Sequence, residues 1–299
     1  MKIKNLKLKI IFLGSSKFVI PILEVLRKNF DLRLVLTTEK NATDAVPAYC
    51  IKNKIPYLSV QQFSNFTIQQ LEKTKAPVGI LADFGIIIPK QILNLFPKGI
   101  INIHPSLLPK YRGPTPVQTA ILNGEKITGI TIMKLDDKVD HGPILGQEKE
   151  EILSTDTAET LYRRLFEKGA NLLIRVLPKY IKGYLNPTEQ NHNNATFTKP
   201  LTRQDGYLDI SNATTAVTKI DRMIRAYFPW PGVWTKVQTT SNKKPLTTNS
   251  KKSEVRSQKL EVRIKFLPGN LIQVEGKKPI SYKDFINGYP EAKKLLFWH

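Results

Sequence analysis

The stretch LKIIFLGSSKFVIPILEVLRKNFDLRLVLT, residues 8–37, indicates the fold of the first half of the chain. Residues 8–13 are an apolar run that stops at Gly14, the pattern of a short buried strand. Residues 18–29 carry apolar side chains at helical spacing, and residues 32–37 form a second apolar run. A strand, a helix and a second strand in this order predict parallel strands with the helix packed on their face.

The same alternation continues along the chain and ends in a long helix, in which Asp156 and Glu159 have the spacing of a capping box. This half therefore predicts an α/β fold, a Rossmann-like, mostly parallel sheet with helices on both faces. The further strand candidates are residues 78–82, 100–103 and 130–133, and the shorter helix candidates are residues 49–54 and 67–73.

The composition and pattern of the sequence change after residue 184. Residues 186–194 are rich in asparagine and read as part of a linker, and β-rich runs with turns follow. We therefore predict a catalytic domain at residues 1–185, a linker at 186–204 and a smaller β-rich, barrel-like domain at 205–299. The strand candidates in this last part are residues 233–238, 260–266 and 271–274, and a basic loop is expected at residues 241–259.

The composition is that of an intracellular globular protein with a strong positive charge. Apolar residues make up 41% of the 299 residues, and the formal net charge is +21. Such a charge favours a polyanionic partner, with nucleic acid the first candidate. The single cysteine, Cys50, excludes an internal disulfide and a thiolate metal site. No apolar segment is long enough to cross a membrane, so we expect a cytoplasmic protein with no membrane partner.

The residues best suited to chemistry follow the predicted strand 100–103, in the stretch NIHPSLLPKYRG at 102–113. Open parallel sheets place their reactive groups just beyond the carboxyl ends of strands. Strand alternation puts the side chains of Asn102 and His104 on the same side. An amide can donate a hydrogen bond to a developing oxyanion, and an imidazole can transfer protons near neutral pH. The pair therefore predicts acyl transfer.

A carboxylate is needed to orient such an imidazole. Asp136, Asp137 and Asp140 all follow the predicted strand 130–133, and the pattern does not choose among them. No serine or cysteine stands in a recognisable nucleophile motif, and residues 14–17 lack the spacing of a phosphate-binding loop. This favours direct attack by the substrate over a covalent intermediate.

These motifs resemble the folate-dependent formyltransferases, and most closely the members of that family that act on a charged tRNA. The resemblance spans nearly the whole chain. It is carried by Asn102, His104 and the residues after them, and by TGITIM at 128–133 and DHGPIL at 140–145. In the second domain it is carried by FTKPLTRQDG at 197–206, IRAYFPWPG at 224–232 and KKPIS at 277–281.

The resemblance implies transfer of a formyl group from 10-formyltetrahydrofolate to the α-amine of methionyl initiator tRNA, by a monomeric enzyme that uses no metal. It selects Asp140 as the carboxylate beside Asn102 and His104. The folate-binding residues that it implies are Ser106, Leu107, Leu108, Pro109, Gly85 and Ile87. One departure stands out, because residues 39–45 form a short, non-basic loop where the tRNA enzymes usually carry a basic insertion.

Three alternatives stay open at this stage. A formyltransferase for a small amine acceptor, such as an amino sugar nucleotide or glycinamide ribonucleotide, would keep the same catalytic residues. A non-catalytic RNA-binding protein would bind tRNA and release no tetrahydrofolate. A folate hydrolase would use the same three residues with water as the attacking group. The basic second domain, with 18 Lys and Arg against 8 Asp and Glu from Pro200 onward, favours the tRNA.

Overall fold

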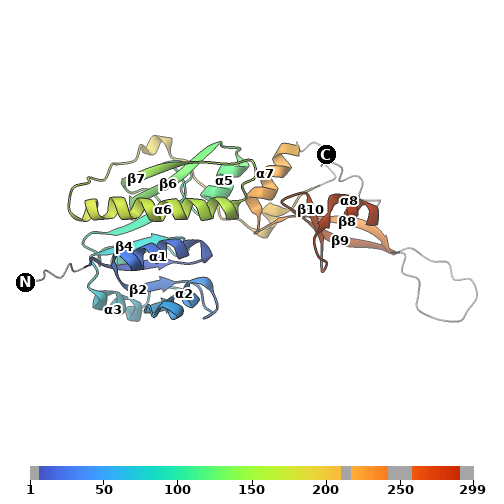
Figure 1. The fold of residues 1–299 in the computed structure, drawn as a ribbon. Coiled ribbons are helices and arrows are strands. Elements are labelled where there is room, and N and C mark those ends of the chain that lie inside the picture. Colours follow the sequence, from blue (N-terminus) through green and yellow to red (C-terminus); the bar gives the residue numbers. More distant parts are fainter. Residues whose placement is uncertain (1–6, 210–216, 242–257, 290–299) are drawn as a thin grey trace, which may run out of the picture. The chain divides into compact units, whose positions relative to one another are not determined.

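The computed structural model describes residues 7–209, 217–241 and 258–289 (Figure 1). The chain divides into two compact units. Met1–Ser154 and Thr160–Pro200 form the first, called here the N-terminal unit, and Thr155–Glu159 and Leu201–His299 form the second, the C-terminal unit. The division after Pro200 means that most of the predicted linker is counted with the N-terminal unit.

The N-terminal unit is built on a seven-stranded sheet of order β3-β2-β1-β4-β5-β6-β7. The strands from β3 to β5 in this order pair in parallel, whereas β6 pairs antiparallel with β5 and β7 pairs antiparallel with β6. The prediction of a mostly parallel sheet is therefore confirmed. The strands are β1 (Lys9–Gly14), β2 (Asp31–Thr37), β3 (Tyr57–Ser59), β4 (Val78–Ala82), β5 (Ile100–His104), β6 (Ile127–Lys134) and β7 (Ile144–Glu151).

Helices cover both faces of this sheet, so side chains that alternate along its strands are buried on opposite sides. Ile100 of β5 packs in a cluster with Leu71 and Ile92 from two of the helices. On the other face, Ile103 lies against Gly169 of the long helix α6, which runs along the sheet (Figure 1). The helices are η1 (Lys17–Val19), α1 (Ile20–Asn29), α2 (Ala45–Asn53), α3 (Asn65–Thr74), α4 (Lys90–Leu93), α5 (Pro116–Leu122) and α6 (Ala158–Ile181).

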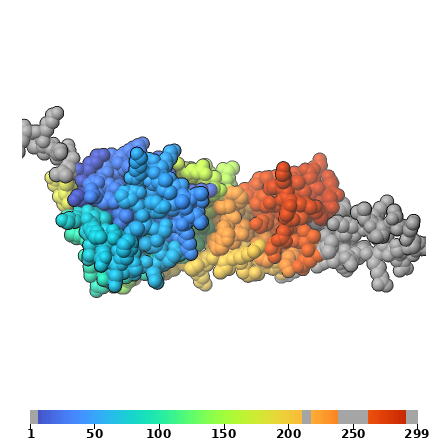
Figure 2. Space-filling view, turned by 90° about the horizontal axis from the view of Figure 1, so that it is seen from below, coloured from blue at the N-terminus to red at the C-terminus, as the bar shows by residue number. Residues whose placement is uncertain are grey.

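Residues of α1, α2 and α3 form much of the face of this unit seen in Figure 2, in blue to cyan. The short loop at residues 39–45 lies directly before α2. Glu39 holds it in place, since its carboxylate accepts hydrogen bonds from the backbone N–H groups of Ser16 and Val46, at 3.0 and 2.7 Å. This loop is therefore compact and tied to the turn after β1 and to the first residues of α2.

The antiparallel pair β6 and β7 departs from the simple alternation that the sequence suggested. Residues 135–143 connect the two strands directly, and Lys134 N–H donates to the carbonyl of Pro143 at 2.9 Å. Without a crossover helix, the second strand must return antiparallel. The loop 135–143 is therefore the turn of a hairpin, and it carries all three candidate aspartates.

Residues 186–200 run along the N-terminal unit after α6, with the 3-10 helix η2 (His192–Asn194) among them. Thr188 and Ile144 exchange backbone hydrogen bonds at 2.8 Å. Arg112 N–H donates to the carbonyl of Thr196, and Thr198 N–H donates to the carbonyl of Arg112, each at 2.8 Å. This segment is built into the unit by backbone pairing.

The C-terminal unit is β-rich, as predicted, with an antiparallel sheet of order β11-β10-β9-β8. The amphipathic helix α7 buries Ile220 and Ile224, and the sequence reading did not identify it. The predicted loop at 241–259 lies mostly outside the described residues. The elements are η3 (Arg203–Gly206), α7 (Val217–Tyr227), β8 (Val233–Ser241), β9 (Gln258–Leu267), β10 (Leu271–Val274), β11 (Ile280–Ser281) and α8 (Tyr282–Gly288).

In the part of the chain that the structure describes, no helix combines the length and apolar character that a membrane span requires.

Candidate active site

A cavity of about 510 Å³ lies in the N-terminal unit at the carboxyl ends of β4 and β5. This is the edge at which open α/β sheets bind their ligands. Its walls come from the segment after β4, the end of β5, the residues before α5 and the loop between β6 and β7. Apolar side chains and backbone form most of the lining, and the polar groups within it include Asn102, His104 and Asp140.

Asn102 and His104 lie on β5, on the same face as Ile100 and opposite the face that packs on α6. The strand is buried along its whole length, and the two polar residues are only 6% and 5% exposed. A buried polar side chain requires hydrogen-bond partners. Both residues find them in the loops that surround the cavity, so the sheet fixes their backbone and the loops fix their side chains.

Asp140 is the partner that they share. Its Oδ1 accepts a hydrogen bond from Asn102 Nδ2 at 3.2 Å, and its Oδ2 lies 3.6 Å from His104 Nδ1. The backbone N–H of Gly113 also donates to Oδ2, at 2.8 Å. The structure therefore brings together the three residues of the predicted catalytic set.

The geometry also assigns the two nitrogens of His104. Its Nε2 lies 3.0 Å from the carbonyl oxygen of Tyr111. A carbonyl oxygen can only accept, so Nε2 carries a proton and donates it there. This leaves Nδ1 facing Asp140, and Nδ1 is the ring atom that can exchange a proton in the cavity.

Asp136 and Asp137, the other two candidates, also line the cavity. Asp136 is occupied elsewhere, because its Oδ2 lies 2.6 Å from Nδ1 of His141. It also accepts a hydrogen bond from the backbone N–H of Lys138 at 3.0 Å. Of the three aspartates, Asp140 is the one with contacts to both Asn102 and His104.

Gly85 and Ile87, two of the predicted folate residues, line the cavity, and Ile87 is 83% exposed. The other four predicted residues form a turn after β5 and are not among the lining residues. Thr131 Oγ1 donates to the carbonyl of Ser106 at 2.6 Å and accepts from the N–H of Leu108 at 3.2 Å. The turn is thus fixed to β6, and the bond between Leu108 and Pro109 is cis. Contact of Ser106, Leu107, Leu108 and Pro109 with folate stays a prediction.

The cavity also includes residues that the sequence reading did not select. Asp83 lies in its wall, adopts a left-handed backbone conformation with φ of 47°, and accepts a hydrogen bond from Ser16 Oγ at 2.6 Å. Tyr162 lines it from α6 and stacks between Phe18 and Phe166, with ring centroids 5.5 and 5.8 Å away. The helical pattern of α6 predicted only a core-facing helix, because spacing alone does not separate cavity lining from core.

Comparison with known families identifies the class of protein. The model of the formyl transferase family matches residues 8–177, and that of the formyl transferase C-terminal domain matches residues 200–290. The N-formyltransferase from Helicobacter canadensis, solved in complex with folinic acid and dTDP-3-aminofucose, shares the fold. It aligns with a TM-score of 0.59 and 21% identity, over 86% of this chain and 95% of that one. The chain thus has the fold and domain content of a formyl transferase.

Curated relatives define the family more closely. The methionyl-tRNA formyltransferase of Chloroflexus aurantiacus is 40% identical over 238 residues, which cover 76% of each protein. That of Thermodesulfovibrio yellowstonii is 33% identical over 298 residues, which cover 93% of this chain and 95% of the relative. The chain belongs to the methionyl-tRNA formyltransferase family, which confirms the resemblance noted in the sequence.

Proposed function

We propose that this protein transfers a formyl group from 10-formyltetrahydrofolate to the α-amine of methionyl initiator tRNA, for the initiation of translation. The observation that carries the proposal is the convergence of Asn102, His104 and Asp140 on one cavity, in a chain of this family. An amide donor, an imidazole and a carboxylate are the groups that acyl transfer to an amine requires.

The cavity suits a folate as the formyl donor. Its volume of about 510 Å³ falls within the roughly 300–1,000 Å³ that small-molecule sites usually have. Apolar side chains on two loops, Ile86 and Ile88 after β4 and Leu135 and Val139 after β6, suit the flat apolar faces of a heterocycle. The family depends on folate, and the Helicobacter canadensis relative was solved with folinic acid. Gly85 and Ile87 would contact the donor from the same loop.

The reaction balances without a further reactant. The amine nitrogen attacks the formyl carbon and forms a new C–N bond, and the bond from that carbon to N10 of the folate breaks. The amine loses a proton and the departing N10 gains one. The products are formylmethionyl-tRNA and tetrahydrofolate.

Each of the three residues has a role that its contacts support. Asn102 uses one amide N–H for Asp140 and can direct the other toward the oxyanion that develops on the formyl oxygen. His104 presents Nδ1, which can donate to the same oxyanion or move the proton from the amine. Asp140 holds both side chains, since one carboxylate oxygen accepts from Asn102 and the other faces Nδ1 of His104.

We assign tRNA as the acceptor from the family to which the chain belongs and from its positive net charge. Recognition of a tRNA phosphate backbone requires positive charge, and the chain carries a formal net charge of +21. The compact loop at 39–45 supplies no basic insertion, so we assign most of the tRNA contact to the basic C-terminal domain, predicted at residues 205–299. A cytoplasmic location, where initiator tRNA is charged, and a monomeric state stay predictions.

An acceptor panel tests the proposal. Purified protein is incubated with 10-formyltetrahydrofolate and methionyl initiator tRNA, an amino sugar nucleotide or glycinamide ribonucleotide, and formation of tetrahydrofolate and formylated product is measured. We expect turnover with the charged tRNA and not with the small acceptors. Turnover with a small acceptor alone would contradict the assignment of tRNA, and tetrahydrofolate released without an acceptor would indicate a hydrolase.

A further inference from the structure

Gln190 makes an unusual set of contacts with the loop that carries Asp140. Its single amide nitrogen, Nε2, donates to the carbonyl of Asp140 at 2.9 Å and to the carbonyl of Gly142 at 2.7 Å. The residue is only 5% exposed. One buried amide group therefore bridges the two backbone carbonyls on either side of His141.

The backbone that Gln190 bridges is unusual as well. Asp140 has φ of 46°, in the left-handed region that residues other than glycine rarely adopt. At Gly142, an added Cβ would collide with the carbonyl oxygen of Lys134, so the chain passes close to β6 there. Such a conformation persists only where surrounding contacts enforce it. The two bonds from Gln190 supply contacts of that kind.

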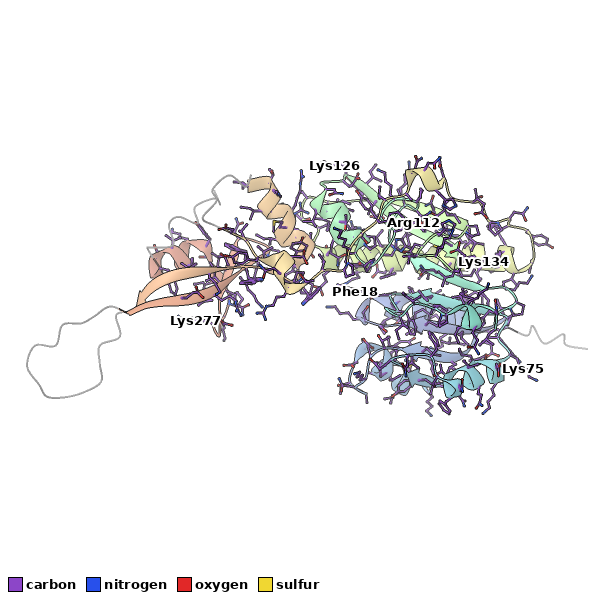
Figure 3. All side chains as sticks on the ribbon, turned by 180° about the vertical axis from the view of Figure 1, so that it is seen from behind. Phe18, Lys75, Arg112, Lys126, Lys134 and Lys277 are labelled. Atoms are coloured by element: carbon purple, nitrogen blue, oxygen red, sulfur yellow. The ribbon has the colours of Figure 1, made fainter. Side chains whose placement is uncertain are left out.

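The remaining polar atom of Gln190 is held in turn by a buried cation. Its Oε1 accepts from Arg112 Nη2 at 2.7 Å, and Arg112 is 3% exposed. Figure 3 labels Arg112, which lies among the elements of the N-terminal unit. Nη2 also donates to Nδ1 of His192 at 2.9 Å, and the guanidinium lies 5.9 Å from the centre of the Phe197 ring. Burial lowers the pKa of Arg112, and the negative charges of Asp140 and Asp136 oppose this shift.

Hydrogen bonds link Gln190 and the segment around Arg112 to the proposed catalytic residues. Tyr111 and Gly113, the neighbours of Arg112 in sequence, contact His104 Nε2 and Asp140 Oδ2 through their backbone groups. The side chain of Arg112 reaches Asp140 by the other route, through Gln190 and the Asp140 carbonyl. One segment therefore fixes the aspartate from both its side chain and its backbone.

We propose that Gln190 is a positioning residue for formyl transfer, which sets the left-handed turn at Asp140 and is itself oriented by Arg112. The inference rests on the proposed function of Asp140. Gln190 touches no reacting atom, so it acts through the distances from the Asp140 carboxylate to Asn102 and His104. Misplacement of a catalytic group by about 1 Å can reduce turnover roughly a hundredfold, so such a residue contributes to kcat.

Two variants of Gln190 and a matched control test the inference. Gln190→Met keeps the size of the side chain and removes all three polar contacts. Gln190→Glu keeps an acceptor for Arg112 and loses the amide that donates to the two carbonyls. Gln62→Met makes the same change at an exposed glutamine outside the cavity. For each variant, kcat, the KM for 10-formyltetrahydrofolate and Tm are measured, with whichever acceptor the wild-type protein formylates.

We expect both Gln190 variants to lose roughly ten- to a hundredfold in kcat with a KM for the folate within about twofold of wild type. Gln62→Met should match wild type. A folded Gln190→Met protein with wild-type kcat would overturn the inference, as would a loss confined to Tm. A crystal structure of Gln190→Met gives a reading independent of activity. It would overturn the inference if the Asp140 turn and its bond to Gly113 were unchanged.

These outcomes are separate from the proposed function. If wild-type protein formylates a small acceptor and not the tRNA, the assignment of the acceptor fails, and the comparison of Gln190 variants proceeds with that acceptor. If wild-type protein formylates the tRNA and the Gln190 variants equal it, the inference about Gln190 alone fails.

Discussion

At the scale of single residues, Asp140 has both carboxylate oxygens committed. Oδ1 receives the amide of Asn102, and Oδ2 receives the N–H of Gly113 and faces His104. The carboxylate can therefore neither rotate nor move away from the imidazole without breaking a hydrogen bond. Preorganisation of this kind means that the polar groups need little rearrangement as charge develops in the transition state.

Replacing the aspartates one at a time tests this assignment. We expect Asp140→Asn to lower kcat by about a hundredfold or more, because the amide accepts less strongly from Gly113 and no longer presents a carboxylate oxygen that orients His104. Asp136→Asn should cost much less, since Asp136 pairs with His141. Steady-state formylation assays measure kcat for both variants. A larger loss in kcat for Asp136→Asn than for Asp140→Asn would contradict the assignment of Asp140 as the catalytic carboxylate.

Cys50 gives a second prediction at this scale. It is fully buried in α2, and this burial raises the pKa of its thiol to about 12. A thiol in that state has almost no thiolate at neutral pH, and the thiolate is the reactive form. We expect no labelling by a thiol reagent in the folded protein at pH 7.5, and one equivalent in denaturant, since the chain has one cysteine. Rapid labelling of the folded protein would contradict this account.

At the scale of elements, the sequence predicted most of the N-terminal sheet. Strands with continuous apolar runs, such as β1 and β4, were placed to within about a residue, because burial on both faces leaves a clear signal. β7 was missed. After Ile144 and Leu145 its residues are glycine or polar, and intermediate and exposed positions alternate along it. A hairpin cannot be told from a crossover when its second strand is not recognised, so the antiparallel pairing of β6 with β7 was missed.

The candidate site shows a similar division. Asn102 and His104 could be found because strand alternation sets two side chains on one face. Asp140 could not be separated from Asp136 and Asp137 by pattern, since the course of a hairpin turn depends on its contacts. No sequence pattern indicated a role for Gln190, because a glutamine in a polar, asparagine-rich segment is typical of a linker. Its position is determined by tertiary hydrogen bonds, which the spacing of residues in the sequence does not reveal.

One ion-pair cluster between elements yields a prediction on stability. Glu150 of β7 lies 2.7 Å from Arg164 Nε and 2.6 Å from Lys168 Nζ of α6. Burial alone would raise its pKa, but the two cations outweigh this and hold the pKa below the ordinary value of 4.5. A lowered carboxylate pKa means that the stabilisation is present above the unfolded-state value and is lost as the pH falls through the folded-state value.

We therefore expect Glu150→Gln to lower the free energy of unfolding by about 1 kcal/mol at pH 7. The difference from wild type should shrink as the pH falls below about 4. Urea unfolding at a series of pH values measures it. Glu151→Gln, at the exposed neighbouring position, is the control and should change little. A difference for Glu150→Gln that is independent of pH would contradict the assignment to this cluster.

At the scale of the whole molecule, the candidate active site lies in the N-terminal unit, and much of the positive charge lies beyond it in sequence. From Pro200 onward there are 18 Lys and Arg against 8 Asp and Glu. Phosphate contacts release counterions from nucleic acid, so the affinity they provide falls as salt rises. This links the net charge of the protein to a measurable property of acceptor binding.

We expect the Kd for methionyl initiator tRNA to rise at least about tenfold between roughly 50 and 200 mM salt, as for proteins with several phosphate contacts. The Kd for the folate should change far less over the same range, which serves as the internal control. Filter binding or fluorescence titration gives both values. A tRNA affinity that is nearly independent of salt would contradict electrostatic recognition of the acceptor.

The most direct test of the account is a single-turnover measurement of formyl transfer to methionyl initiator tRNA, with protein in excess and saturated with 10-formyltetrahydrofolate. Wild-type protein is compared with Asn102→Ala and His104→Ala, after folate binding by each variant has been verified. The account predicts rapid transfer by wild type and a loss of about a hundredfold or more in the rate for each variant, with folate affinity largely kept. Variants that transfer the formyl group at nearly the wild-type rate would contradict it.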